Sequence, residues 1–96
     1  MEAPVTLVVR LPGGTPATGA QVKGVNHDAL SESRRDLVGT TDAQGTLTWP
    51  DVGIGPVGSR CTFSVRFVDE TGEEWYTERT ERIYGPTTLT VTLDIF

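Results

Sequence analysis

Apolar and polar residues alternate along several short segments of this sequence, and most of these segments end at glycine or proline. Alternation with a period of two predicts strands that turn one face toward a core and the other toward solvent. The clearest example is the C-terminal segment, whose expected inward residues are Leu89, Val91, Leu93 and Ile95. The pattern predicts seven strands, at residues 5–11, 20–22, 36–41, 46–49, 61–69, 74–80 and 87–96.

The spacing of these strands indicates one all-β domain over residues 1–96. Short strands that recur about every ten residues are typical of sandwiches. We therefore predict a seven-stranded antiparallel β-sandwich of two sheets, with Ig-like or transthyretin-like Greek-key connections. Residues 27–35 lose the alternation and are polar, so we expect an exposed loop there, with one helical turn starting at Ser31.

Residues 41–52 organise the expected fold. Asp42 can accept hydrogen bonds from the backbone of its own turn, and Gly45 can adopt the positive φ that ends such a turn. In the strand that follows, Leu47 and Trp49 share one face, which we expect to be the core face. Pro50 is expected to end this strand, because proline has no N–H for a ladder.

Composition excludes some classes of partner. The chain has a net charge of −5, one lysine (Lys23) and seven arginines that are spread along the sequence. Nucleic-acid binding draws on clustered basic residues, so we expect no nucleic-acid partner. No segment has the apolar length of a membrane span, and the N-terminus lacks a signal-peptide pattern, so we expect no membrane partner. The chain is thus expected to be used without export or to be a domain of a longer exported protein.

Residues able to carry chemistry are few and scattered. Cys61 is the only cysteine and lies in an alternating apolar run, which predicts a buried thiol and no internal disulfide. His27 is the only histidine and is expected to be solvated in the polar loop. Catalysis and metal binding need such groups to converge. We therefore predict no enzymatic activity, no cofactor and no metal.

Acidic residues gather near a predicted hairpin turn, at Asp69, Glu70, Glu73 and Glu74. Carboxylate oxygens are ligands for Ca²⁺, but this segment lacks the regular ligand spacing of a dedicated calcium loop. We favour a charged, soluble turn in which Gly72 supplies the left-handed position.

Two motifs in the chain resemble the transthyretin-like or carboxypeptidase-regulatory-like sandwich family. Residues 14–22 match Gly-x-Pro-x-x-Gly-Ala-x-Val, and residues 41–49 match Thr-Asp-x-x-Gly-x-Φ-x-Φ, where Φ is apolar. The resemblance covers nearly the whole chain and implies a two-sheet sandwich. It implies no chemistry, because both motifs are signatures of turns and packing. Residues 58–63 depart from the family pattern, because the usual Gly-x-Tyr entry to the next strand is longer here and has no tyrosine.

Residues 11–19, Leu-Pro-Gly-Gly-Thr-Pro-Ala-Thr-Gly, are similar to a variant found in modules of minor tail proteins of long-tailed phages. This resemblance implies a virion component that is synthesised in the host cytoplasm. We accordingly expect a non-enzymatic structural or interaction module, a subunit of a larger assembly such as a phage tail or another virion surface. Its expected partners are other protein subunits. The residues expected to contact them are Ile54, Val57, Trp75, Tyr76 and Tyr84.

An alternative is an accessory carbohydrate-binding or spacer domain of a secreted enzyme or cell-surface protein, in which case the domain is extracellular. Exposed aromatic rings at Tyr76 or Tyr84 would then stack on a glycan. At least one of Trp75 and Tyr76 is expected in the core, and the pattern leaves open which one, because each face of their strand carries one aromatic. A stand-alone hydrolase of the transthyretin-related type needs several converging histidines and is the least favoured interpretation.

Overall fold

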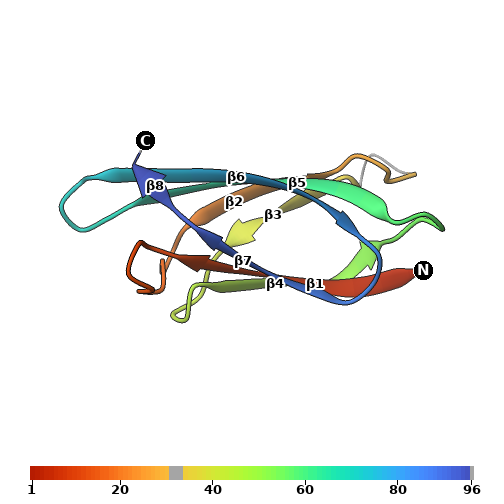
Figure 1. The fold of residues 1–96 in the computed structure, drawn as a ribbon, viewed down its shortest axis with the longest axis horizontal. Coiled ribbons are helices and arrows are strands. Elements are labelled where there is room, and N and C mark those ends of the chain that lie inside the picture. Colours follow the sequence, from red (N-terminus) through yellow and green to blue (C-terminus); the bar gives the residue numbers. More distant parts are fainter. Residues whose placement is uncertain (31–33, 96) are drawn as a thin grey trace.

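The computed structural model describes residues 1–30 and 34–95 and shows two β-sheets packed face to face (Figure 1). One sheet has the strand order β4-β1-β7, and the other has the order β3-β2-β5-β6-β8. The strands are β1 (Glu2–Arg10), β2 (Gln21–Asn26), β3 (Asp36–Thr40), β4 (Thr46–Gly53), β5 (Ser59–Val68), β6 (Glu74–Ile83), β7 (Thr87–Thr92) and β8 (Asp94–Ile95). The predicted all-β sandwich of two sheets is confirmed. The helical turn expected from Ser31 lies outside the described residues.

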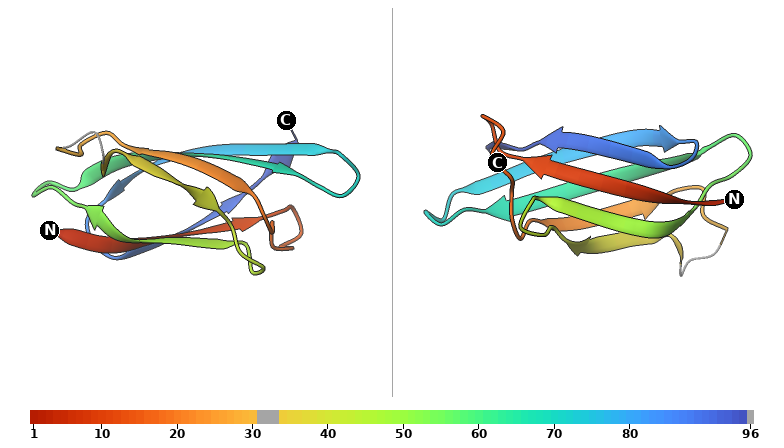
Figure 2. Two further views of the ribbon diagram at one scale, coloured as in Figure 1. Left: turned by 180° about the vertical axis from the view of Figure 1, so that it is seen from behind. Right: turned by 90° about the horizontal axis from the view of Figure 1, so that it is seen from below.

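The core lies between the two sheets, which Figure 2 shows from behind and from below. Every second residue of β1 and of the first part of β5 is buried, as their alternation predicts; the largest are Leu7 and Phe63. Trp49 of β4 stacks on Phe63 of β5 across the core, with ring centroids 5.5 Å apart. Trp49 therefore faces the core, as predicted. The thiol of Cys61 is also buried, as expected.

One strand pair runs in the direction opposite to the prediction. β7 lies parallel to β1, with Val5 beside Thr87 and Arg10 beside Thr92. β6, which precedes β7 in the chain, belongs to the other sheet, so the chain crosses between sheets before β7 begins. No hairpin constrains the direction of β7, and the sandwich is consequently mixed rather than fully antiparallel.

The sequence predicts a single C-terminal strand at residues 87–96, but the described residues 87–95 form two strands. The described part of the sandwich therefore has eight strands and not seven. The N–H of Leu93 donates to the carbonyl of Arg10 (2.8 Å), which continues the contact with β1. The next two residues then pair with β6 of the other sheet. Because the chain changes sheet at this point, Ile95 is 61% exposed and does not enter the core as predicted.

Pro50 does not end its strand. β4 continues to Gly53, and its register with β1 shifts between the Val5–Trp49 pair and the Ala3–Val52 pair. β4 is an edge strand, and Pro50 lies within this irregularity. Proline is tolerated at edges and bulges because no ladder partner needs its missing N–H.

Thr41 joins the two motifs that were found in the sequence. Its side chain is buried; the hydroxyl donates to the carbonyl of Ala17 (2.6 Å) and accepts from the N–H of Ala20 (2.8 Å). Its backbone N–H donates to the carbonyl of Ala20 (3.0 Å), and its carbonyl accepts from Gly19 (3.1 Å). These four hydrogen bonds fix the β1–β2 connection against the start of the β3–β4 turn.

The β3–β4 turn forms as predicted. Asp42 Oδ1 accepts from the N–H groups of Gln44 and Thr46, both at 2.9 Å, and Gly45 has a φ of +76°. The carbonyl of Gly45 accepts from the N–H of Val9 (2.8 Å) at the end of β1. A Cβ on residue 45 would lie 2.5 Å from the carbonyl oxygen of Val9, so both the backbone conformation and the contact require glycine.

Replacing Thr41 by valine should lower the free energy of unfolding by about 1–3 kcal/mol, because the buried Ala20 N–H loses its side-chain acceptor and the Ala17 carbonyl its hydroxyl donor. Thr41→Ser keeps the hydroxyl and should lose less. Thr88→Val, on the exposed face of β7, is the matched control and should change stability little. Urea denaturation measures all three variants. A Thr41→Val variant that is as stable as the native protein would contradict the role assigned to the hydroxyl.

Gly45→Ala should destabilise the domain by about 2–4 kcal/mol, since alanine at a positive φ is strained and its Cβ would contact the Val9 carbonyl. Gly53→Ala is the control, because a Cβ at residue 53 meets nothing within 4 Å. Thermal unfolding of both variants tests the difference. Similar melting temperatures for the two would contradict the proposed close approach at Gly45.

Candidate functional site

The residues predicted to contact partners lie at opposite ends of the sandwich. Ile54 and Val57 belong to the β4–β5 connection, and Tyr84 follows β6 at the same end, on the right in Figure 1. Trp75 and Tyr76 lie at the other end, where β8 pairs with β6. The structure therefore does not bring the five residues into one surface.

Ile54 is placed differently from the prediction. It is 5% exposed and belongs to the core, so it cannot serve as an exposed contact. Its N–H donates to the carbonyl of Met1 (2.7 Å), which holds the β4–β5 connection against the N-terminal residues. Val57 is 75% exposed and Tyr84 is 69% exposed, as a contact role requires. Tyr84 lies against the backbone of Gly58, where an added Cβ would be 2.9 Å from its ring.

Trp75 and Tyr76 have different environments, which settles the register that the sequence left open. Trp75 pairs with Phe67, packs against the core and donates its indole N–H to Asp69 Oδ2 (3.1 Å). Tyr76 lies on the outer face of β6 and its hydroxyl donates to Glu78 Oε2 (3.1 Å). Trp75 is consequently the partly buried aromatic of this strand, and its polar atom is already paired.

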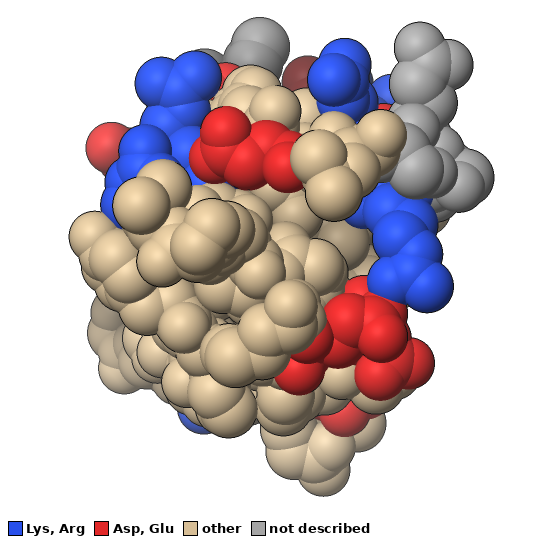
Figure 3. Space-filling model, turned by 90° about the vertical axis from the view of Figure 1, so that its right-hand side faces the viewer, with Lys and Arg blue, Asp and Glu red and all other residues tan. Residues whose placement is uncertain are grey.

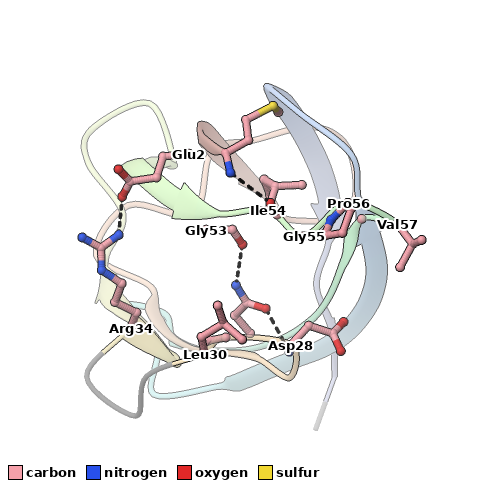
Figure 4. A pocket seen from close by; sticks show the side chains of 13 residues that line it. Glu2, Asp28, Leu30, Arg34, Gly53, Ile54, Gly55, Pro56 and Val57 are labelled. Atoms are coloured by element: carbon pink, nitrogen blue, oxygen red, sulfur yellow. Dashed lines mark hydrogen bonds and ion pairs between the residues drawn. The ribbon is translucent and has the colours of Figure 1, made fainter.

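A pocket of about 420 Å³, which the sequence analysis did not find, opens at the end of the sandwich that carries Val57. It lies between the N-terminal residues, the β2–β3 connection and the β4–β5 connection (Figure 4). Its lining residues are Met1, Glu2, Asn26, Asp28, Ala29, Leu30, Arg34, Gly53, Ile54, Gly55, Pro56, Val57 and Gly58. We call this region the pocket end.

Asn26 braces the pocket. The residue is fully buried, and its Nδ2 donates to the carbonyl of Gly53 (2.9 Å) while its Oδ1 accepts from the N–H of Asp28 (3.2 Å). These bonds tie the β2–β3 connection to the end of β4. The amide is therefore satisfied within the protein and has a structural role.

Charged side chains lie at the margin of the pocket end. Glu2 and Arg34 form an ion pair on one side, and the hydrogen bond that Arg34 donates to the Glu2 carboxylate raises the pKa of Arg34 above its ordinary value. Asp28, on another side, accepts from the N–H of Arg60 (2.7 Å). Figure 3 views this end and shows an uncharged central area with acidic and basic groups mainly around it.

Exposed apolar residues are concentrated at the pocket end. Seven large hydrophobic side chains are exposed among the described residues, and four of these lie here: Met1, Leu30, Val57 and Tyr84. We call these four residues the apolar rim. Leu30 was missed by the sequence analysis. It is the only large apolar residue in the polar segment 27–35, and that isolation was the available signal.

The described residues contain no group of three or more His, Cys, Asp or Glu side chains that could hold a metal ion. Burial raises the pKa of the Cys61 thiol to about 11, so the thiol is protonated at neutral pH and is a poor nucleophile. His27 is exposed and its ring is hydrogen-bonded to Thr62 Oγ1 (2.8 Å), outside the pocket. Among the same residues, no helix has the length and apolar character needed to cross a membrane.

Asp69 organises the acidic β5–β6 hairpin. Its Oδ1 accepts from the N–H groups of Thr71 (2.9 Å) and Glu73 (3.0 Å) and from the Thr71 hydroxyl, and Gly72 adopts the predicted left-handed φ of +85°. Because Oδ2 accepts from the indole N–H of Trp75, both carboxylate oxygens of Asp69 accept hydrogen bonds within the hairpin. The hydrogen bonds, chiefly those from the side chains of Thr71 and Trp75, lower the pKa of Asp69 to about 2.

Comparison with known proteins identifies the fold but no family. No protein-family model matches the chain, and no curated protein has significant similarity to it. Among solved structures, it is similar to a DUF4876 family protein from Bacteroides thetaiotaomicron VPI-5482, with a TM-score of 0.52 and 17% sequence identity. The similarity covers 95% of this chain and 23% of that protein. The chain thus corresponds to less than a quarter of the length of the structure it resembles.

Asp69→Asn should reduce stability at neutral pH, and the difference from the native protein should shrink as the pH falls. An unfolded aspartate has a pKa of about 3.9, and the folded value is lowered to about 2. The carboxylate therefore stabilises the folded state fully above about pH 4 and loses this contribution between about pH 4 and pH 2. Urea denaturation across this range is the measurement, with exposed Asp36→Asn as the charge-matched control. A difference that does not change with pH would contradict the role assigned to the carboxylate.

Proposed function

We propose that this domain is a non-enzymatic interaction module that binds a neighbouring protein subunit at its pocket end. The observation that carries this proposal is the apolar rim around the pocket. Exposed apolar side chains that cluster are unfavourable in water and often mark a protein contact. Scattered single side chains would need no such explanation.

The chemistry of the pocket end suits a polypeptide partner. A volume of about 420 Å³ can accept apolar side chains, and Ile54 supplies an apolar wall. The buried amide of Asn26 is already paired with Gly53, so it offers little to a small polar ligand. Asp28 and Arg34 place charges of both signs at the margin, as in the polar rim that commonly surrounds an apolar contact.

A phage tail or another virion surface is the leading example of the assembly in this proposal. It is favoured by the resemblance of residues 11–19 to modules of minor tail proteins. In the fold, Ala17 of this segment is buried and its carbonyl is held by Thr41. The segment accordingly supports the architecture, and the partner contact is assigned to the opposite, pocket end.

A spacer domain is the second candidate, and the shape of the molecule favours it. The domain measures 43 × 20 × 17 Å, and the first and last described residues lie near opposite ends of the long axis. The glycan-binding alternative has less support. Tyr76 and Tyr84 lie at different ends and Trp75 is partly buried, so these rings form no shared stacking platform.

Val57→Asp should release the domain from its assembly without lowering its stability, because Val57 is already exposed to solvent and a carboxylate would oppose an apolar contact. Val38→Asp is the control, since Val38 is 61% exposed on β3, away from the pocket. Sedimentation of particles from the native source, followed by mass spectrometry of each fraction, locates the two variants and the native chain.

The expected result is that the native chain and Val38→Asp sediment with a heavy particle at a fixed ratio to other proteins, whereas Val57→Asp stays light. A native chain found only in light fractions would overturn the interaction-module proposal. A Val57→Asp chain that still sediments with the particle would show that the pocket end is not the contact. If the domain is a spacer, mass spectrometry should find the native chain and both variants as part of one longer polypeptide.

A further inference from the structure

β6 has an open edge along more than half of its length. On one side it pairs with β5 throughout, from Glu74 beside Val68 to Ile83 beside Ser59. On the other side, the described residues of β8 pair with Trp75 and Tyr76. Within residues 1–30 and 34–95, no strand pairs with this outer edge over residues 77–83 (Figure 1). Backbone N–H and C=O groups along such an edge are available to another strand.

The side chains on the open edge have a self-complementary charge pattern. The sequence from residue 78 is Glu78, Arg79, Thr80, Glu81 and Arg82. If two such edges pair antiparallel with Thr80 opposite Thr80, residue 78 of one copy faces residue 82 of the other, and residue 79 faces residue 81. Every charged residue then lies opposite a residue of the other sign. Opposite charges at directly facing positions stabilise a strand pair, and like charges destabilise it.

The centre of this pattern coincides with the centre of the open stretch. Residue 80 is the midpoint of residues 77–83, so a second copy aligned about Thr80 would fill the stretch from end to end. It would stop where β8 already covers Tyr76. An arrangement in which the same surface meets itself is the isologous contact of a twofold dimer.

The remaining edges lack this feature. β3, β4 and β8 carry one charged residue each, which are Asp36, Asp51 and Asp94. β7 has no charged residue, and its carbonyl at Thr90 accepts from Arg79 Nη1 (3.3 Å). Self-pairing by complementary charge is therefore specific to β6.

We propose that two copies of this chain associate through the open edges of β6, as an antiparallel strand pair with its twofold axis at Thr80. In each single copy Arg79 and Glu81 form an ion pair (2.7 Å), so these inner-face charges are satisfied before association. On the exposed outer face, Glu78 accepts hydrogen bonds from the hydroxyls of Tyr76 (3.1 Å) and Ser64 (3.3 Å). Arg82 Nη1 donates to the carbonyl of Val57 (3.3 Å). The second copy adds a residue of opposite charge facing each of Glu78 and Arg82. The paired edge adjoins the pocket end at Arg82, but this inference does not rest on the proposed function.

Charge reversal on the purified chain tests the proposal, with mass measured by light scattering after size-exclusion chromatography. Glu78→Arg places two arginines opposite each other at both ends of the pair, and Arg82→Glu places two glutamates there. Each variant alone should be a monomer, whereas the native chain should have twice the 10.4 kDa mass of one chain. An equimolar mixture of the two variants should form a heterodimer, because every arginine then faces a glutamate. The double variant Glu78→Arg/Arg82→Glu should again be a homodimer.

The mixing experiment separates loss of pairing from loss of folding, because an unfolded variant cannot regain a partner when the other variant is added. Glu70→Arg, in the exposed hairpin turn, makes the same change in charge away from the edge and should stay dimeric. A native chain that is monomeric at all concentrations would overturn the proposal. Dimers of either single variant, or no dimer in the mixture, would overturn it as well. Val57→Asp should remain a dimer. A failure of the pocket-end proposal can therefore be distinguished from a failure of the dimer proposal.

Discussion

The buried hydroxyl of Thr41 is the interaction on which the arrangement of the two sheets depends most. It bonds to the backbone on both sides of the β1–β2 connection, at Ala17 and Ala20, while the following turn places Gly45 against Val9 of β1. At this point the chain passes from one sheet to the other and back. The two motifs noted in the sequence meet here, which explains why they identify a sandwich and carry no chemistry.

Local chemistry explains what could be predicted. Asp42, Gly45 and Gly72 act through turns of a few residues, and the burial of Cys61 follows from an alternation that one strand displays by itself. The missed features depend on neighbours in space. The alternation of buried and exposed residues has a period of two whichever sheet a strand joins, so it could not reveal the change of sheet at Leu93. Pro50 is tolerated within β4 because β4 is an edge strand, which the sequence alone does not show.

The pocket end could be predicted only in part, because local composition reveals a loop but not which of its residues are buried. The Gly- and Pro-rich β4–β5 connection drew attention to Val57, which is exposed, but a segment without periodicity gives no basis for assigning faces, and Ile54 is in the core. Asn26, Leu30 and Ile54 come from separate segments, and only the fold brings them around one cavity. Sequence reasoning therefore found a loop, whereas the structure shows how two connections and the N-terminal residues enclose a pocket.

The pocket end and the β6 edge are compatible as two contact surfaces. β6 runs toward the pocket end and finishes there at Ile83, next to the loop that carries Val57. Antiparallel pairing about Thr80 would therefore direct the two pocket ends of a dimer away from each other, along the long axis of the molecule. Leu30 and Val57 lie in connections and not on the paired edge. Because Thr80 is nearer to Ile83 than to Glu74, each pocket end would lie close to the twofold axis, and the two β5–β6 hairpins would form the extremes of the dimer. The two apolar sites would then face in opposite directions on either side of the axis.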